Sequence, residues 1–227
     1  MAMTKTNKTL MQLALAGVIG AAIGALKSLG HVGPYIHAMF SISREMMISV
    51  VLWCVFSLYW SYASKDSKPT ASGESRGSRA LHVFWVNAAF FELLLPVPGL
   101  TRRFLPASHW LIYAGLVIQL AFTMLAIWSR RHLGSNWSGE VRIAAQHQLV
   151  RSGPYRFIRH PIYTGVLGMY VGTCLVSGEI HAPVALLIVM VAYWRKIRME
   201  ERALGQTFGA QFQEYQRGTW AVVPLVY

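Results

Sequence analysis

His147-Gln-Leu-Val-Arg-Ser-Gly-Pro-Tyr-Arg-Phe-Ile-Arg-His-Pro-Ile-Tyr-Thr-Gly165 is a polar stretch, rich in arginine and broken by glycine and proline, between long apolar segments. Backbone that leaves the helix near a bilayer is tolerated only where it is buried in protein or lines a polar cavity. The amide and guanidinium groups of this loop are therefore expected to face an anionic ligand. The loop is the first candidate for a functional site in a chain whose flanking segments read as membrane helices.

The composition supports a membrane protein, because 54% of the 227 residues are hydrophobic, only 13% are charged, and eight are tryptophan. We predict an all-α, polytopic membrane helical bundle of five or six spans, with a cytoplasmic ligand loop and a C-terminal amphipathic helix. The predicted spans cover residues 10–29, 45–63, 80–100, 109–128, 162–178 and 182–194. The last two form a helical hairpin.

The net charge of +12 reflects membrane topology and does not indicate a nucleic-acid partner. Basic residues gather in three segments that an even number of spans places on the same side as Lys5 and Lys8. These residues are Lys65, Lys68, Arg76 and Arg79, then Arg130, Arg131, Arg142, Arg151, Arg156 and Arg159, then Arg195, Lys196, Arg198, Arg202 and Arg217. The positive-inside rule makes the N-terminus, the 129–161 loop and the C-terminus cytoplasmic. A cleaved secretory signal at the N-terminus is the less favoured alternative, since its apolar run is long.

Two parts of the chain are expected to differ in role. Residues 1–128 form a transmembrane half with spans one to four, and residues 129–227 form a ligand-binding half with the loop, the helical hairpin and the C-terminal helix. The stretch Lys65–Ser78 is expected to be a flexible cytoplasmic loop. Cys54 and Cys174 fall inside spans and indicate neither a disulfide nor a metal site.

The tail after the last span predicts an amphipathic helix over Arg195–Gln216. Its apolar stripe at spacings of three and four consists of Ile197, Glu201, Leu204, Phe208, Phe212 and Tyr215. A carboxylate within such a stripe needs a basic partner or a polar ligand, because an unpaired buried charge costs several kcal/mol. The hairpin returns the tail to the cytoplasmic side, so Arg159 and Glu200 are expected to be neighbours.

Two motifs in this order carry a resemblance to a known family. The first is His147-x-Leu-Val-x-x-Gly-Pro-Tyr followed by Arg159-His-Pro-x-Tyr-x-Gly165, and the second is Glu200-Glu-x-x-Leu204 with Phe208-Gly209, Tyr215 and Pro224. Together they resemble the isoprenylcysteine carboxyl methyltransferase family and its phospholipid methyltransferase relatives. The resemblance covers about residues 133–224.

The resemblance implies S-adenosylmethionine as cofactor and methyl transfer as the reaction. Arg159 suits a bidentate grip on the cofactor carboxylate, and Glu200 or Glu201 suits its ammonium or ribose hydroxyls. Backbone at Leu149, Val150 and Gly153 suits the adenine edge, with His147 alongside, while Tyr155 and Tyr163 offer aromatic faces. His160 faces cofactor or substrate. The candidate catalytic residues are Arg159, His160 and Glu201; no metal site is expected.

Structural roles remain open for several of these residues. Arg159 can snorkel to lipid phosphate, and His160 can cap the next helix. Tyr155 and Tyr163 can belong to an interfacial aromatic belt, and Glu201 can pair with Arg198 or Arg202 on its own helix.

The acceptor is expected to be lipophilic or membrane-delivered, either a small molecule or a prenylcysteine-type molecule, and membrane lipids are expected as further partners. A carboxylate acceptor needs no general base, whereas an amine or hydroxyl would need Glu200, Glu201 or His160. In the apolar half, Asn87, Glu92 and Gln119 should face the interior of the bundle. Glu92 is the best candidate for a group on the substrate side, and a structural hydrogen bond to a neighbouring helix is the favoured alternative for it.

Two other functions compete with methyl transfer. A membrane sterol reductase would bind NADPH, but those proteins carry Asn and an acidic residue where this chain has Ile162 and Val166. A non-catalytic lipid-binding membrane protein is the other alternative, and the complete set of motif residues argues against it.

Overall fold

The computed structural model describes residues 43–63, 75–94, 99–134 and 149–222. Residues 44–222 belong to one compact unit. Its elements are α3 (Arg44–Ala63), α4 (Arg76–Leu94), α5 (His109–Leu133), the 3-10 helix η3 (Gly153–Arg156), α6 (Pro161–Ser177), α7 (His181–Phe208) and α8 (Ala210–Arg217). The described chain is thus all-helical, as predicted, and the predicted span at residues 10–29 lies outside the described residues.

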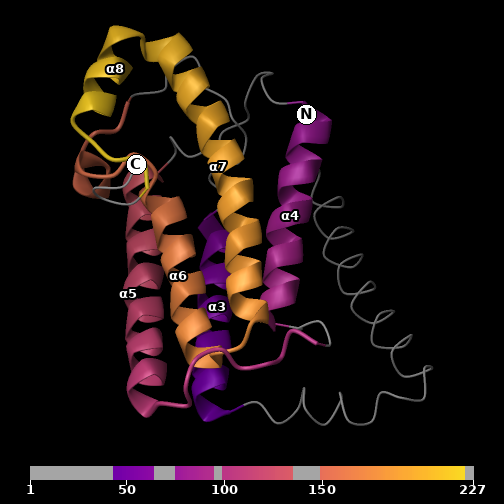
Figure 1. Ribbon diagram of the computed structural model, residues 1–227. Helices are drawn as coiled ribbons and strands as arrows, with labels where there is room; N and C mark the ends of the chain where they lie inside the picture. Colours follow the sequence, from indigo (N-terminus) through magenta and orange to yellow (C-terminus); the bar gives the residue numbers. More distant parts are fainter. Residues whose placement is uncertain (1–42, 64–74, 95–98, 135–148, 223–227) are drawn as a thin grey trace. The chain divides into compact units, whose positions relative to one another are not determined.

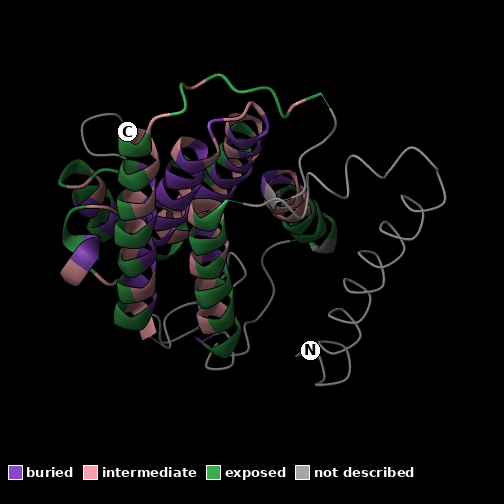
Figure 2. Ribbon diagram, turned by 90° about the horizontal axis from the view of Figure 1, so that it is seen from below, coloured by how far each residue is buried: buried purple, intermediate pink, exposed green. Residues whose placement is uncertain are grey.

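Helix α6 is the centre of the bundle and is buried along most of its length (Figure 2). It packs against α5 at backbone distance, because three glycines of α6 face that helix. A Cβ added at Gly172 would lie 2.6 Å from the carbonyl oxygen of Gly115, and one at Gly165 would lie 2.7 Å from the Cβ of Ala126. In lipid, apolar burial alone does not drive two helices to associate. Small residues at the interface promote association because they let the two backbones approach closely.

The remaining helices surround this pair. Helices α4 and α7 run antiparallel, because His82 near the start of α4 lies beside Tyr193 and the Glu92 carbonyl near its end is bonded to His181. Trp53 connects α3 to both neighbours, with ring contacts to Phe90 of α4 at 5.5 Å and to Tyr170 of α6 at 5.0 Å. Consecutive helices therefore alternate in direction, and the ends of α5 and α7 lie together with η3 and α8 at one end (Figure 1).

The C-terminal part differs from the sequence prediction. The last span and the tail form one continuous helix, α7, and the predicted helix over Arg195–Gln216 is wrong because the chain breaks at Gly209. Gly209 has a φ of +53°, in the left-handed region that glycine reaches without strain. Helix α8 then turns back towards η3. The predicted loop Lys65–Ser78 is also too long, since α4 begins at Arg76.

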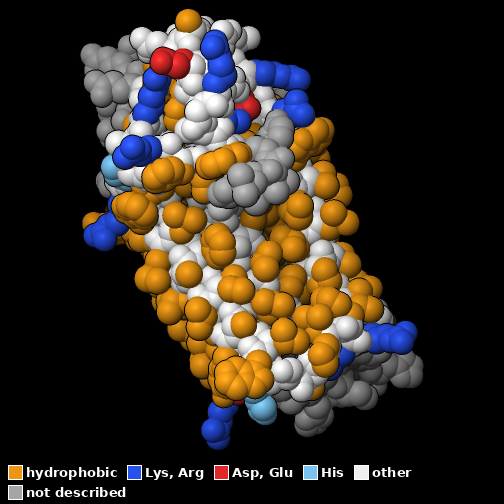
Figure 3. Space-filling view, turned by 60° about the vertical axis from the view of Figure 1, so that its left-hand side comes forward, with side chains coloured by type: hydrophobic (Ala, Val, Ile, Leu, Met, Phe, Trp, Pro, Cys, Tyr) orange, Lys and Arg blue, Asp and Glu red, His pale blue; other side chains and the backbone are white. Residues whose placement is uncertain are grey.

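Two of the described helices, Arg44–Ala63 and His109–Leu133, are long and apolar enough to cross a membrane, and Pro161–Ser177 is apolar but shorter. Exposed hydrophobic side chains cover the middle of the helices, while arginine side chains lie at the ends (Figure 3). Trp110 and Trp128, near opposite ends of α5, are 86% and 55% exposed, which suits interfacial residues.

Candidate active site

The candidate site is built on a corner of the chain between η3 and α6. Residues 157–160 run parallel to residues 220–221 of the C-terminal segment. The backbone N–H groups of Arg159 and His160 donate to the carbonyls of Trp220 (2.8 Å) and Ala221 (2.9 Å). The Thr164 hydroxyl donates to the carbonyl of Val222 at 2.7 Å. The C-terminal segment therefore fixes the backbone of the Arg-His-Pro motif.

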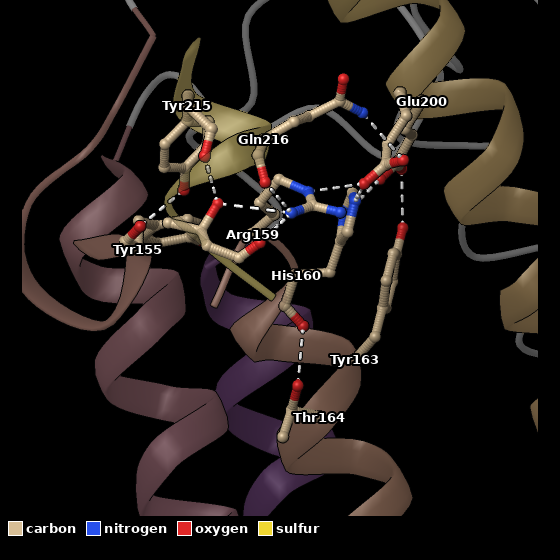
Figure 4. Close-up of polar contacts among 10 residues, drawn as sticks. Tyr155, Arg159, His160, Tyr163, Thr164, Glu200, Tyr215 and Gln216 are labelled. Carbon is tan, nitrogen blue, oxygen red and sulfur yellow. Dashed lines mark hydrogen bonds and ion pairs between the residues drawn. The ribbon is translucent and has the colours of Figure 1, made fainter. Parts of the chain in front are cut away.

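The guanidinium of Arg159 joins three segments of the chain (Figure 4). Its Nε donates to Oε1 of Glu201 at 2.8 Å, and its Nη1 donates to the carbonyls of Gln216 (3.2 Å) and Thr219. Its side chain is 9% exposed, which makes this ion pair largely desolvated. Truncating one partner of such a pair leaves the other charge uncompensated, at a cost of about 3–5 kcal/mol.

His160 lies between two carboxylates. Its Nδ1 is 3.4 Å from Oε2 of Glu200, and its Nε2 is 3.3 Å from Oε1 of Glu201. Glu200 also accepts the hydroxyl of Tyr163 through Oε1 at 2.7 Å. Gln216 donates to Oε2 of Glu201 at 3.2 Å. Residues from α6, α7 and α8 thus meet in one hydrogen-bonded group.

The charged side chains of this group shift one another's pKa values. Burial opposes the charged form of His160, but its contacts with Glu200 and Glu201 outweigh burial and raise its pKa above the ordinary value. Burial likewise opposes ionisation of the two carboxyl groups. Hydrogen bonds from His160 and the nearby charge of Lys196 lower the pKa of Glu200. Hydrogen bonds from His160 and Arg159 and their charges lower the pKa of Glu201 to about 2. Both carboxyl groups are therefore anionic at neutral pH.

A column of four rings leads from this group to α4. Ring centroids are 5.7 Å apart for His160 and Tyr163, 4.6 Å for Tyr163 and Tyr193, and 5.8 Å for Tyr193 and His82. The column connects the predicted cofactor half with the apolar half.

The loop before the corner supplies backbone groups. Gly153 has a φ of +58°, and a Cβ there would lie 2.8 Å from the ring of His132, which also approaches Ser152 at 2.8 Å. Tyr155 is buried, and its carbonyl accepts the hydroxyl of Tyr215 at 2.6 Å. Leu149 and Val150 are half-buried, and within the described ranges no hydrogen bond satisfies their backbone groups.

The structure brings together Arg159, His160, Tyr163, Glu200 and Glu201. The carboxylate that Arg159 contacts is that of Glu201, whereas the sequence analysis placed Glu200 beside it. Tyr155 lies close by but its hydroxyl points to the Ser129 carbonyl at 3.4 Å. His147 lies outside the described residues. Glu92 is near the C-terminal end of α4, far from this group, so it does not join the site.

Sequence reasoning missed several groups that complete the site. Gln216 and Thr219 act largely through backbone carbonyls, which leave no sequence signal. The sequence analysis placed Tyr193 in an apolar span and counted Lys196 only among the basic residues that set the membrane topology. Their i, i+3 and i+7 spacing with Glu200 along one helix could have placed them on the same face. Among the described residues, no group of three or more His, Cys, Asp or Glu is arranged to hold a metal ion.

Known proteins resemble this chain over the helices that build the site. The phospholipid methyltransferase family profile matches residues 110–211. A protein-S-isoprenylcysteine O-methyltransferase A of Arabidopsis thaliana is 33% identical over 141 residues, which cover 60% of this chain and 67% of that protein. The chain belongs to the isoprenylcysteine carboxyl methyltransferase family.

Other members of the isoprenylcysteine carboxyl methyltransferase family agree. A probable protein-S-isoprenylcysteine O-methyltransferase of Oryza sativa subsp. indica is 30% identical over 123 residues, covering 52% of this chain and 64% of its own length. The solved eukaryotic intramembrane Ras methyltransferase, an isoprenylcysteine carboxyl methyltransferase, matches with a TM-score of 0.50 and 25% identity. That match covers 68% of this chain and 55% of the solved one. The chain thus spans somewhat under two thirds of these relatives, and it is a membrane protein of the same family.

Proposed function

We propose that this protein is an integral membrane methyltransferase that uses S-adenosylmethionine to methylate the carboxylate of a prenylcysteine-type, lipophilic acceptor. The observation that supports it most is the meeting of Arg159, His160, Glu200 and Glu201 at one end of the helices. Family membership supplies the reaction class.

The site suits a ligand with the groups of S-adenosylmethionine. Two buried carboxylates suit an ammonium and ribose hydroxyls. Arg159 retains Nη2, which bonds to no described residue, for a carboxylate. The half-buried backbone of Leu149 and Val150 suits the edge of an adenine.

When bound, S-adenosylmethionine supplies a methyl group on a positively charged sulfur, which passes to a nucleophile while the electrons of the carbon–sulfur bond return to sulfur. Glu200 and Glu201 hold the positive ligand groups, and His160 and Arg159 keep the two carboxylates ionised and fixed. Tyr163 orients Glu200. A carboxylate acceptor is already ionised at neutral pH, so no residue has to remove a proton, and alignment and exclusion of water carry the catalysis.

The membrane arrangement follows from the same placement. We infer a multi-pass protein with the N-terminus, the 129–161 loop and the C-terminus in the cytoplasm, where the charged cofactor is dissolved. The acceptor enters from the bilayer, because exposing a long apolar chain to water costs about 0.8 kcal/mol per methylene. The site then has an aqueous entrance and a membrane entrance.

Phospholipid methylation is the second candidate, and the match to the phospholipid methyltransferase profile favours it. An amine acceptor would need a base, and Glu200 and Glu201 are both occupied by cationic donors. NADPH-dependent reduction is not favoured, because the relatives reported above are named methyltransferases.

Calorimetric titration of the detergent-solubilised protein tests the cofactor. Micromolar binding of S-adenosylmethionine and S-adenosylhomocysteine, with no heat from NADPH, is the expected result. Binding of NADPH without binding of S-adenosylmethionine would contradict methyl transfer and would indicate a reductase.

A further inference from the structure

His132 is a side chain next to the candidate site that the mechanism above does not use. It lies in the last turn of α5, against the loop that precedes the Arg-His-Pro corner. Nε2 of its ring is 2.8 Å from Oγ of Ser152, and the ring stacks on that of Tyr155 with centroids 6.4 Å apart and planes at 22°. Ser152 and Tyr155 also bond to each other through their backbones at 3.2 Å. His132 therefore holds both ends of one turn.

Gly153 lies inside this turn, directly against the face of the His132 ring. A Cβ added there would lie 2.8 Å from Cε1 and 2.9 Å from both Nδ1 and Nε2. Three ring atoms at nearly equal distance place that point over the ring face. The φ of Gly153 is +58°, a value that strains other residues. A larger residue at this position would thus strain the backbone and displace the His132 ring as well.

The backbone proposed to receive the adenine comes immediately before this turn. Leu149 and Val150 are followed by Arg151, which donates to a backbone carbonyl of α8, and by Ser152, which contacts His132 of α5. The loop is therefore attached to one helix on each side. A backbone group presents its hydrogen bonds to a ligand accurately only where neighbouring contacts fix it.

Helix α5 is the firmer of these two supports. It packs against α6 at backbone distance, whereas α8 is a helix of eight residues that follows the turn at Gly209. The last turn of α5 also ends in a backbone hydrogen bond from Gly134 to the carbonyl of Arg130. The contact of His132 is thus the one that ties the loop to the packed bundle.

We propose that His132 is a positioning residue for the adenine end of the cofactor. Its ring holds Ser152 and Gly153 in place, and through them it sets where the backbone of Leu149 and Val150 meets the adenine edge. This role requires no contact between His132 and the ligand. The assignment rests on the proposed binding of S-adenosylmethionine.

The test compares two ligands that differ only at the adenine edge. S-inosylhomocysteine carries a carbonyl oxygen where S-adenosylhomocysteine carries an amino group, which reverses the donors and acceptors of that edge. By calorimetry, wild-type protein should bind S-adenosylhomocysteine at least about 10-fold more tightly, because the wrong edge leaves polar groups unpaired. The His132→Ala variant should weaken S-adenosylhomocysteine by about 10-fold and S-inosylhomocysteine by less than about 3-fold, so that most of the preference disappears.

Kinetics and a conservative variant separate positioning from general support of the fold. With amine-acetylated S-farnesylcysteine as acceptor, His132→Ala should raise the KM for S-adenosylmethionine about 10-fold and leave kcat within about 3-fold, because no reacting group is changed. His132→Gln should bring the affinity for S-adenosylhomocysteine back to within about 3-fold of wild type, since its amide can still bond to Ser152.

A double substitution tests the contact between the ring and the loop. In the wild-type background, Gly153→Ala strains the backbone and displaces the His132 ring, but in the His132→Ala background only the strain remains. The loss of S-adenosylhomocysteine affinity on Gly153→Ala should therefore be at least about 3-fold smaller in the second background. Equal losses would contradict the contact.

His109→Ala is the matched control, because His109 is an exposed histidine at the other end of α5 that stacks on Tyr113 at 6.3 Å. Both affinities should stay within about 3-fold of wild type in that variant. If His132→Ala does not fold, Ser152→Ala removes the same hydrogen bond from the exposed loop, and the same pattern is expected of it.

Four outcomes overturn the assignment. Unchanged affinity for S-adenosylhomocysteine in the folded His132→Ala variant removes His132 from the cofactor site. An equal loss for both ligands makes His132 a residue that supports the fold alone. Equal affinity of wild-type protein for the two ligands means that the adenine edge is not recognised. These three leave the proposed methyl transfer intact, whereas wild-type protein that binds neither ligand overturns the proposed function and the role of His132 with it.

Discussion

Arg159 joins the Arg-His-Pro corner to both α7 and the C-terminal segment, so its loss should weaken cofactor binding as well as the fold. Replacing it with alanine removes the partner of Glu201 and the donor to the carbonyls of Gln216 and Thr219. We expect Arg159→Ala to weaken binding of S-adenosylhomocysteine by about 1.5–3 kcal/mol, the range for hydrogen bonds to charged groups. Calorimetry measures it, and unchanged affinity in the folded variant would contradict the assignment of Arg159 to the cofactor site.

His160 should make the stability of the protein depend on pH. Because its folded-state pKa is raised, its contribution to stability is complete below the ordinary pKa and disappears as the pH rises through the raised value. We expect the melting temperature of wild-type protein to fall as the pH rises from the ordinary histidine pKa through the raised pKa of His160. The His160→Gln variant should lose this dependence while keeping the rest of the profile; a profile identical to wild type would show that His160 is not held as a cation between Glu200 and Glu201.

The carboxyl group of Glu201 makes the stability of the protein depend on pH at the acidic end of the scale. The folded-state pKa of Glu201 is lowered to about 2, so its contribution is present above the ordinary pKa and is lost as the pH falls from about 4.5 towards 2. Both contributions are therefore complete between the ordinary pKa of a glutamate and the ordinary pKa of a histidine.

At the scale of single helices, the α5–α6 interface is the least tolerant contact. A Cβ at Gly172 would lie 2.6 Å from the Gly115 carbonyl and 2.7 Å from the backbone nitrogen of Gln119, and backbone cannot move aside as a side chain can. We expect Gly172→Ala to destabilise the protein by about 1–3 kcal/mol, as overpacking does, with a lower melting temperature. Gly77→Ala in α4 is the control, because nothing lies within 4 Å of its added Cβ; equal effects of the two substitutions would count against the close approach.

The C-terminal segment is the element that completes the site. Ending the chain after Gly218 removes the backbone acceptors of Arg159 and His160 at Trp220 and Ala221. The truncated protein should still insert in membranes, because α3 to α7 remain, but its affinity for S-adenosylhomocysteine should fall below detection by calorimetry. Normal affinity after truncation would mean that the corner holds its shape without the segment.

Helix starts were predicted more accurately than the tail. Helix α5 begins at His109 as predicted, and α6 begins at Pro161, one residue before the expected position. The tail was wrong because Phe208 and Phe212 keep helical spacing across Gly209, so the periodicity continues where the backbone turns. Hydrophobic periodicity records which side chains are buried and does not record a residue with positive φ.

Contacts between side chains of the site could be predicted from the sequence, whereas contacts made by its backbone could not. The contacts of Arg159 with Glu201 and of Tyr163 with Glu200 join residues of the two motifs, whose carboxylates needed partners, although the sequence analysis placed Arg159 beside Glu200. The parallel pairing of Ile158 with Trp220 has no sequence pattern, because any residue supplies the same amide groups.

For the whole molecule, the alternating helices predict that the two ends of the bundle lie on opposite sides of the membrane. Single cysteines at exposed Arg156 and exposed Arg102, in a background with Cys54 and Cys174 replaced by alanine, should react with an impermeant thiol reagent from opposite sides. In right-side-out vesicles only the Arg102 position should be labelled, and in inverted vesicles only the Arg156 position. Labelling of both positions from one side would contradict the inferred topology and the two entrances to the site.

The transfer of a labelled methyl group tests the central claim most directly. Purified protein in lipid vesicles is incubated with S-adenosylmethionine that carries a radioactive methyl group and with amine-acetylated S-farnesylcysteine. The account predicts a lipophilic product that releases its label as methanol in mild base, as a methyl ester does, and predicts no label with the carboxamide analogue. Label that stays in base-stable product, or no product from any prenylcysteine acceptor, would contradict carboxylate methylation by this protein.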